Sequence, residues 1–129
     1  MIEEDEEWED IYRKYPLEEI PWHSDEPDKN LIEVLRKKNI KIGYALDVCS
    51  GAGTNSVFLA EKGFDVTGID ISETAMIIGR QRAEKAGISE KCKFFSGDIF
   101  KRNYQKTNSI SSLTEDVIII YQKKISQNS

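Results

Sequence analysis

Two short apolar runs, each with an aspartate at or near its end, constrain the fold of this chain more than any other feature. The first run covers residues 44–48 and contains Asp47, and the second covers residues 64–69 and is followed by Asp70. Between them, residues 54–62 are long enough and apolar enough for a helix that packs on a sheet. This order predicts a β-α-β unit with two parallel strands.

A glycine pair, Gly51 and Gly53, connects the first run to the helix. Glycine adopts positive φ and lets the backbone approach a ligand closely, and the following helix offers unpaired N–H groups at its N-terminus. A carboxylate at the end of the second strand, here Asp70, can accept both hydroxyls of a ribose. The pattern therefore predicts a nucleotide-type site at the strand ends.

Two more strands are expected. Residues 93–96 form a third apolar run that Gly97 and Asp98 close, and the β-branched run at residues 117–121 predicts a fourth strand beside the first. Three aspartates then meet at the carboxyl edge of one sheet, where open α/β folds bind ligands. The predicted fold class is an α/β, Rossmann-like open parallel sheet flanked by helices, incomplete at about four strands.

Capping residues and apolar spacing predict two further helices. Asp28 caps a helix over residues 29–38, and Ser72 caps one that runs to about residue 86 before Gly87. The buried stripe of the first consists of Leu31, Ile32 and Leu35, and the solvated face of the second carries Arg80, Arg82 and Lys85.

Charge and apolar patterning divide the chain into an acidic segment over residues 1–28, a domain over residues 29–121 that carries the predicted nucleotide-type site, and a polar tail over residues 122–129. The segment holds twelve acidic and two basic residues, so the rest carries sixteen basic against eleven acidic residues. Those lysines are scattered, which disfavours a nucleic-acid partner. No run approaches a membrane span and no secretory signal precedes the domain, so we expect a cytoplasmic protein.

The acidic segment contains the aromatic residues that could approach a ligand. Trp8, Ile11, Tyr12 and Tyr15 fall on one helical face. This face either docks on the core or serves as a lid over the ligand cleft. Trp22 follows in a proline-rich loop, as a packing anchor or a ligand contact, and His23 is expected on the surface.

The run from Asp47 to Ser72 resembles the cofactor-binding half of class I S-adenosylmethionine-dependent methyltransferases. The first motif of that family is acid-x-Gly-x-Gly-x-Gly. Asp47, Gly51 and Gly53 match it, and Cys49 stands where the first glycine of the motif is expected. Ser96-Gly97-Asp98-Ile99 resembles their third motif. Pro21-Trp22 resembles a feature of the small-molecule group that includes thiopurine and tellurite-resistance enzymes.

The resemblance implies S-adenosylmethionine as cofactor and a small-molecule methyl acceptor. The implied cofactor-binding residues are Asp47, Cys49, Gly51, Gly53, Asp70, Ile71, Asp98, Ile99 and Trp22; no catalytic residue and no metal ligand is implied. The resemblance covers about residues 8–100 and then ends, as in a truncated or C-terminally divergent methyltransferase with little transfer activity. We also expect self-association through the exposed edge of the fourth strand.

Two alternatives remain at the level of sequence. The spacing of Gly51, Gly53 and Ser56 approximates the dinucleotide fingerprint of a nicotinamide-dependent oxidoreductase fragment. The second alternative is a non-catalytic remnant that binds the cofactor or dimerises. Asp47 beside the turn and the Gly97–Asp98 pair favour the methyltransferase interpretation over NAD.

Overall fold

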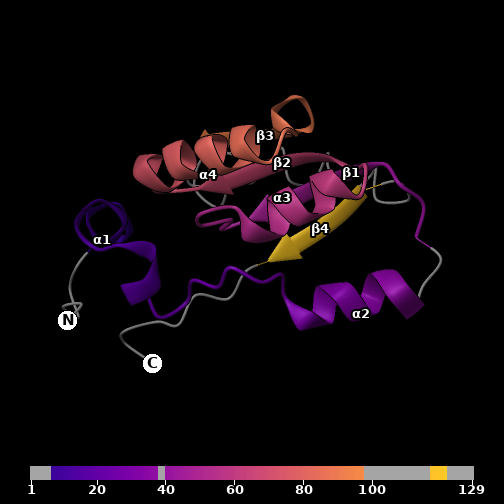
Figure 1. Ribbon diagram of the computed structural model, residues 1–129, viewed down its shortest axis with the longest axis horizontal. Helices are drawn as coiled ribbons and strands as arrows, with labels where there is room; N and C mark the ends of the chain where they lie inside the picture. Colours follow the sequence, from indigo (N-terminus) through magenta and orange to yellow (C-terminus); the bar gives the residue numbers. More distant parts are fainter. Residues whose placement is uncertain (1–6, 38–39, 98–116, 122–129) are drawn as a thin grey trace.

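A computed structural model describes residues 7–37, 40–97 and 117–121 (Figure 1). Its helices and strands follow the order expected from the sequence. Each helix and strand predicted within residues 29–121 begins and ends within two residues of the predicted position. In chain order the elements are α1 (Trp8–Lys14), the 3-10 helix η1 (Leu17–Glu19), α2 (Lys29–Lys37), β1 (Tyr44–Val48), α3 (Thr54–Glu61), β2 (Asp65–Asp70), α4 (Glu73–Lys85), the 3-10 helix η2 (Ser89–Lys91), β3 (Cys92–Ser96) and β4 (Val117–Tyr121).

The four strands form one parallel sheet in the order β3-β2-β1-β4. Tyr44 at the start of β1 pairs with Asp65 of β2 on one side and with Val117 of β4 on the other. The expected position of the fourth strand beside the first is confirmed. β4 is an edge strand of the described sheet, and self-association through it stays a prediction.

Alternating side chains give the sheet one well-covered face. Helices α3 and α4 lie side by side against it (Figure 1), as expected for successive right-handed β-α-β crossovers. The strand residues Ala45, Val66 and Phe94 point into this layer and are at least 97% buried. The side chains of Tyr44 and Phe95 alternate with them and are more than half exposed.

The Phe94 ring lies among three glycines from three elements. A Cβ atom added to Gly53 at the start of α3 or to Gly68 in β2 would lie 2.7 Å from this ring, and one added to Gly79 in α4 would lie 3.0 Å from it. Real Cβ atoms essentially never lie closer than 3.0 Å to such a ring, and 3.0 Å itself is tighter than nine in ten of their contacts. The glycines therefore let α3, β2 and α4 close around one aromatic side chain.

The N-terminal helix α1 is part of the same core. Ile11 is fully buried and Tyr12 is 4% exposed, and both belong to the cluster that includes Leu59 and Met76. The expected aromatic face is thus confirmed as a docking face. In α2, by contrast, Ile32 does not join the buried stripe, because its side chain is 37% exposed whereas Leu31 is buried.

Candidate functional site

The turn between β1 and α3 consists of residues held in a left-handed backbone conformation. Cys49, Gly51 and Gly53 have φ values of 59°, 57° and 83°. Cys49 is the one non-glycine residue with positive φ in the described chain, and it stands where the motif expected from the sequence has its first glycine. The backbone thus keeps the glycine conformation at that position although the side chain differs.

Asp70, at the end of β2, is bonded to this turn. One oxygen, Oδ2, accepts a hydrogen bond from the Gly51 N–H at 2.9 Å, and Oδ1 accepts one from the Ser72 N–H at 3.1 Å. The residue is only 2% exposed. These two backbone contacts orient the Asp70 carboxylate at the end of β2, beside the glycine turn.

Asp47 has a different environment from Asp70. Its carboxylate is fully buried and accepts a hydrogen bond from the Ser56 hydroxyl of α3 at 2.6 Å. This contact ties the end of β1 to the first turn of α3 beneath the glycine turn. Asp47 therefore supports the turn from the core side, and the sequence analysis did not predict its contact with Ser56.

Arg82 of α4 fastens the same turn from the outside. Its Nη1 donates to the Ala52 carbonyl oxygen at 2.9 Å and lies 3.0 Å from the Thr54 hydroxyl oxygen. Its side chain is 27% exposed, so the expectation of a solvated Arg82 was wrong. A helix face read from periodicity alone does not reveal that a long guanidinium side chain can bend back to a neighbouring turn.

Residues 20–28, here called the strap, cross over the start of α3. The Thr54 hydroxyl donates to the Ser24 carbonyl oxygen at 2.6 Å, and the Asp28 N–H donates to Asn55 Oδ1 at 2.8 Å. Arg82 also lies 3.6 Å from the Asp25 carboxylate. These contacts fix the strap against the glycine turn from three points.

An aromatic group joins the strap to α1. The Trp22 indole N–H donates to the Tyr12 hydroxyl at 2.7 Å, and the Trp22 ring packs edge-on against Trp8 with centroids 4.9 Å apart. Burial raises the pKa of Tyr12; the hydrogen bond from Trp22 opposes this rise and the nearby Asp70 carboxylate adds to it. Tyr12 is therefore a neutral phenol at physiological pH, beside the acid at the end of β2.

Glu9 holds α1 at the start of α4. Its Oε1 accepts hydrogen bonds from the Ser72 hydroxyl and the Thr74 N–H, both at 2.8 Å, and its Oε2 accepts one from the Thr74 hydroxyl at 2.6 Å. Burial disfavours the ionised carboxylate, but these hydrogen bonds outweigh it and lower the pKa of Glu9. α1 is thus fastened two residues from Asp70.

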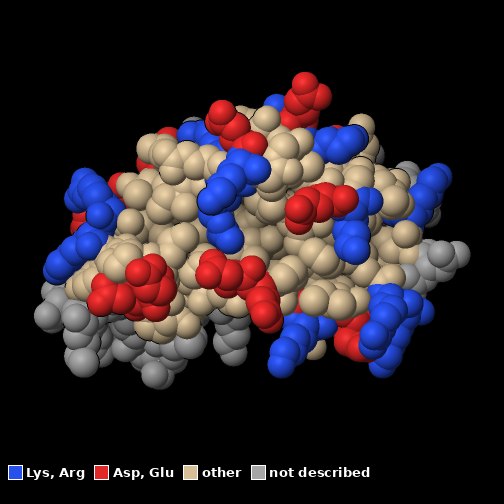
Figure 2. Space-filling model, viewed as in Figure 1, with Lys and Arg blue, Asp and Glu red and all other residues tan. Residues whose placement is uncertain are grey.

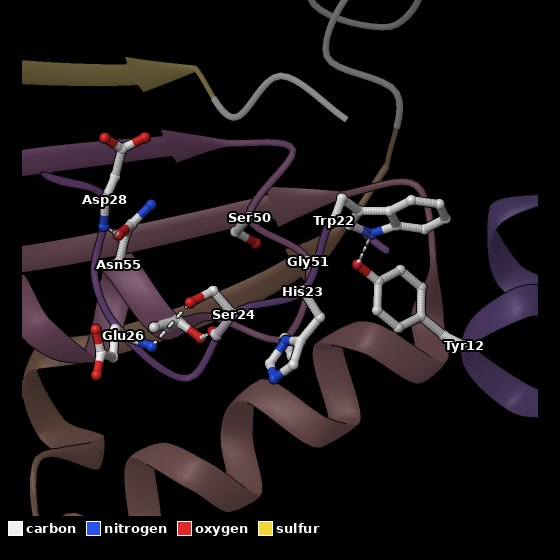
Figure 3. A pocket seen from close by; sticks show the side chains of 11 residues that line it. Tyr12, Trp22, His23, Ser24, Glu26, Asp28, Ser50, Gly51 and Asn55 are labelled. Carbon is white, nitrogen blue, oxygen red and sulfur yellow. Dashed lines mark hydrogen bonds between the residues drawn. The ribbon is translucent and has the colours of Figure 1, made fainter. Parts of the chain in front are cut away.

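The strap, α1 and the glycine turn enclose a cavity of about 150 Å³ (Figure 3). Tyr12 and Trp22 lie on one side of it, Glu26, Asp28 and Asn55 lie on the other, and Ser50 and Gly51 lie between them. The His23 side chain, expected on the surface, also lines the cavity and is only 7% exposed. The strap is held on α3 by contacts between residues that lie far apart in the sequence. The local sequence of this loop therefore does not predict that His23 is buried.

The sequence-predicted residues thus separate into three groups. Cys49, Gly51, Asp70 and Trp22 lie at or beside the turn, and Ile71 follows Asp70 with 51% of its surface exposed. Asp47 and Gly53 support the turn from the core. Asp98 and Ile99 lie outside the described residues. The contacts of Glu9, Asn55, Ser56 and Arg82 were not predicted, because each joins a partner more than eight residues away.

A family model described as a methyltransferase domain matches residues 45–123. The chain belongs to this methyltransferase family. The match covers β1, the glycine turn and β2 and continues through β4, so it extends beyond residue 100, where the resemblance was expected to end. S-adenosylmethionine is the cofactor of the family, and this decides against the NAD alternative.

Individual known proteins also resemble the chain. One relative is the 23S rRNA (uracil(747)-C(5))-methyltransferase of Pyrococcus abyssi, which is 46% identical to this chain over 39 residues. That stretch covers 30% of this chain and 10% of the relative. A structure solved for the conversion of a disulfide bond into a thioacetal group during echinomycin biosynthesis superimposes with a TM-score of 0.66 at 27% identity, covering 75% of this chain and 40% of that one.

A third relative has the cofactor product bound. The SAM-dependent methyltransferase of Thiobacillus denitrificans, solved in complex with S-adenosyl-L-homocysteine, superimposes with a TM-score of 0.53 at 27% identity and covers 70% of this chain and 36% of that one. The chain spans two fifths or less of the length of each of these three proteins. None of the helices in its described residues is long and apolar enough to cross a membrane.

Proposed function

We propose that this methyltransferase domain transfers the methyl group of S-adenosylmethionine to a small-molecule acceptor. The observation that carries the proposal is the cavity of about 150 Å³ beside Gly51, closed by the strap and by the Tyr12–Trp22 pair. A cavity of this kind accepts a small molecule or one side group of a larger one, but not a folded RNA surface. Figure 2 adds that acidic and basic side chains alternate on the face it shows rather than forming a basic stripe.

The cofactor would lie at the carboxyl edge of the sheet. We assign Asp70 to the ribose hydroxyls, the exposed Ile71 side chain to one face of the adenine ring, and the positive-φ turn at Cys49 and Gly51 to the close approach of the methionine end. Trp22 would close the site from the strap. Asp98 and Ile99 stay assigned to the adenine side by their resemblance to the third motif.

The turn of this chain fits such a ligand. Cys49 and Gly51 both have left-handed φ, and Gly51 has no side chain, so the backbone of the turn can approach a ligand closely at that residue. The carboxylate of Asp70 is already oriented by two backbone N–H groups. When bound, S-adenosylmethionine supplies a methyl group on a sulfonium that is already activated for attack, so the protein contributes by positioning the acceptor and excluding water.

The experiment is a methyl-transfer assay with radiolabelled cofactor. Small thiols, selenols and amines are offered in one series, and RNA and a lysine-containing peptide in another. We expect label on a member of the small-molecule series. Label only on RNA or peptide would overturn the small-molecule assignment, and cofactor binding without any transfer would favour the non-catalytic alternative.

A further inference from the structure

We propose that the cavity beneath the strap binds the methyl acceptor as a small amine in its cationic form, and that His23 removes the proton from that amine. This inference rests on the proposed function. It assigns an acceptor class and a proton-accepting residue to the cavity beside Gly51 and Trp22, the two lining residues that we also assign to the cofactor site.

The charge of the cavity lining favours a cation. Two carboxylates, those of Glu26 and Asp28, line the cavity, and no lysine or arginine is among its lining residues. One oxygen of Asp28 caps α2 by accepting from the Asn30 N–H at 2.7 Å, and a carboxylate retains acceptor capacity beyond such a bond. The positive side chain beside the cavity, Arg82, is already bonded to the Ala52 carbonyl and the Thr54 hydroxyl and lies 3.6 Å from the Asp25 carboxylate. An anionic acceptor would therefore meet the two carboxylates of the lining.

The opposite side of the cavity is aromatic. The rings of Tyr12 and Trp22 lie across from the carboxylates (Figure 3), and their relative position is fixed by the hydrogen bond from the indole N–H to the phenol. Aromatic faces attract ammonium groups and pack against the apolar part of an amine. The cavity thus combines an apolar wall with an acidic end, which matches an amine that carries a small apolar group.

His23 is an independent feature of the same cavity. Its side chain is more than nine-tenths buried, and its Nε2 lies 2.8 Å from Asp25 Oδ1. A carboxylate partner places the imidazole proton on Nε2 and leaves the lone pair on Nδ1. Within the described residues, Nδ1 has no hydrogen-bond partner, so the ring is available as a base.

The proposed step balances as follows. The ammonium gives one proton to His23 Nδ1, and the resulting amine lone pair forms the N–C bond to the methyl carbon. The C–S bond breaks with its electron pair on sulfur, which becomes a neutral thioether. The product is a methylated ammonium, and His23 then releases its proton to water.

Binding is tested with benzylamine, its neutral isostere benzyl alcohol and the slightly larger anion phenylacetate, on protein saturated with S-adenosylhomocysteine. Fluorescence of the tryptophans is the signal, since Trp22 lines the cavity. We expect benzylamine to bind at least about tenfold more tightly than benzyl alcohol, and the Glu26→Gln/Asp28→Asn double variant to abolish the preference. Glu18→Gln, an exposed residue outside the cavity, is the matched control and should retain it.

Several results would overturn the acceptor assignment. Equal binding of the three probes would remove the cation preference, and tighter binding of phenylacetate would reverse it. Competition between benzylamine and S-adenosylhomocysteine would show that the cavity holds the methionine end of the cofactor instead. Failure of S-adenosylhomocysteine to bind, measured separately by calorimetry, would refute the proposed function rather than this inference.

The base is tested by nuclear magnetic resonance, because His23 is the only histidine of the chain. We expect its spectrum to show the Nε2–H tautomer, a change of its ring signals on addition of benzylamine, and a loss of the preference for that tautomer in Asp25→Asn. The other charged or titratable groups around the ring are Arg82 on α4, Tyr12 on α1 and Glu26 on the strap. The same spectra of Arg82→Gln separate the effect of the guanidinium on the ring from the effect of Asp25.

His23→Asn should bind benzylamine within about threefold of the wild type but transfer methyl at least about tenfold more slowly at pH 7. The wild-type rate should fall as the solution is made more acidic, and the variant should lose this dependence. An Nδ1–H tautomer, or a variant with the wild-type rate and pH profile, would overturn the role of His23 as the base.

Discussion

The Asp70 carboxylate, at the end of β2, accepts a hydrogen bond from the Gly51 N–H in the turn after β1, at 2.9 Å. This contact joins two features that the sequence separates by nineteen residues. It aligns a buried carboxylate with the backbone of a left-handed turn before any ligand arrives. The site is therefore held in place by the protein itself, which lowers the cost of ordering it on binding.

Asp70→Asn tests this contact. An asparagine NH₂ group cannot accept from a backbone N–H, so one buried donor loses its charged partner, at a cost of about 1.5–3 kcal/mol. We expect a loss of that size in the free energy of unfolding by urea, and at least about tenfold weaker binding of S-adenosylhomocysteine. Asp65→Asn, at the other end of β2, is the control: its exposed carboxylate is 3.5 Å from Lys91, and such surface pairs contribute about 0–1 kcal/mol. Equal effects of both variants would contradict the assignment.

Gly53→Ala tests whether the second glycine of the motif serves the core. The substituted Cβ would lie 2.7 Å from the Phe94 ring, at a φ of 83°. A left-handed alanine costs roughly 1–2 kcal/mol, and overpacking adds roughly 1–3 kcal/mol. Gly87→Ala is the matched control, because its φ is 77° and nothing lies within 4 Å of the added Cβ.

Chemical denaturation should show Gly53→Ala as the more damaging change of the two. Combining Gly53→Ala with Phe94→Leu should recover part of the difference, since the smaller side chain relieves the contact. Equal midpoints for Gly53→Ala and Gly87→Ala would mean that the backbone conformation alone requires glycine at position 53.

Glu9 predicts a pH-dependent attachment of α1. Its folded-state pKa is lowered, so its contribution to stability is complete above the ordinary glutamate pKa of about 4.3 and is lost as the pH falls through the lower folded value. Hydrogen exchange should therefore show α1 amides losing protection in acid before those of β1. In Glu9→Gln the protection at pH 7 should already be low. Unchanged exchange in that variant would contradict the role of Glu9.

Arg82→Gln should loosen the strap. The variant loses the guanidinium contacts to the Ala52 carbonyl, the Thr54 hydroxyl and the Asp25 carboxylate. We expect faster limited proteolysis within residues 20–28 and weaker ligand binding, while Lys85→Gln, exposed on the same helix, should behave as the wild type. Wild-type proteolysis of Arg82→Gln would show that Thr54 and Asn55 are sufficient to hold the strap.

Much of the fold could be predicted from the sequence because its signals are local. The apolar runs set β1 and β4 to the residue, and Ser72 accepts from the Ala75 N–H as the expected cap of α4. The reason for Gly53 could not be predicted in this way. Its requirement comes from Phe94, forty-one residues later, and local sequence does not show which ring fills the space of a missing side chain.

The glycine turn and the carboxylate of the site could be predicted from the sequence, but the residues that close the cavity could not. Gly51 and Asp70 come from a compact motif, and the structure brings them into contact. His23 was expected on the surface because a lone histidine in a loop has no periodicity to indicate burial. Its position depends on the strap, whose anchors Asn55 and Arg82 lie on two different helices. Such tertiary contacts do not follow from spacing.

Calorimetric titration of the chain with S-adenosylhomocysteine and with NAD, under one set of conditions, tests the central claim most directly. The account predicts one saturable site for S-adenosylhomocysteine, weakened at least about tenfold in Asp70→Asn and unchanged in Asp65→Asn, and no saturable heat with NAD. Tight binding of NAD with no response to S-adenosylhomocysteine would contradict it.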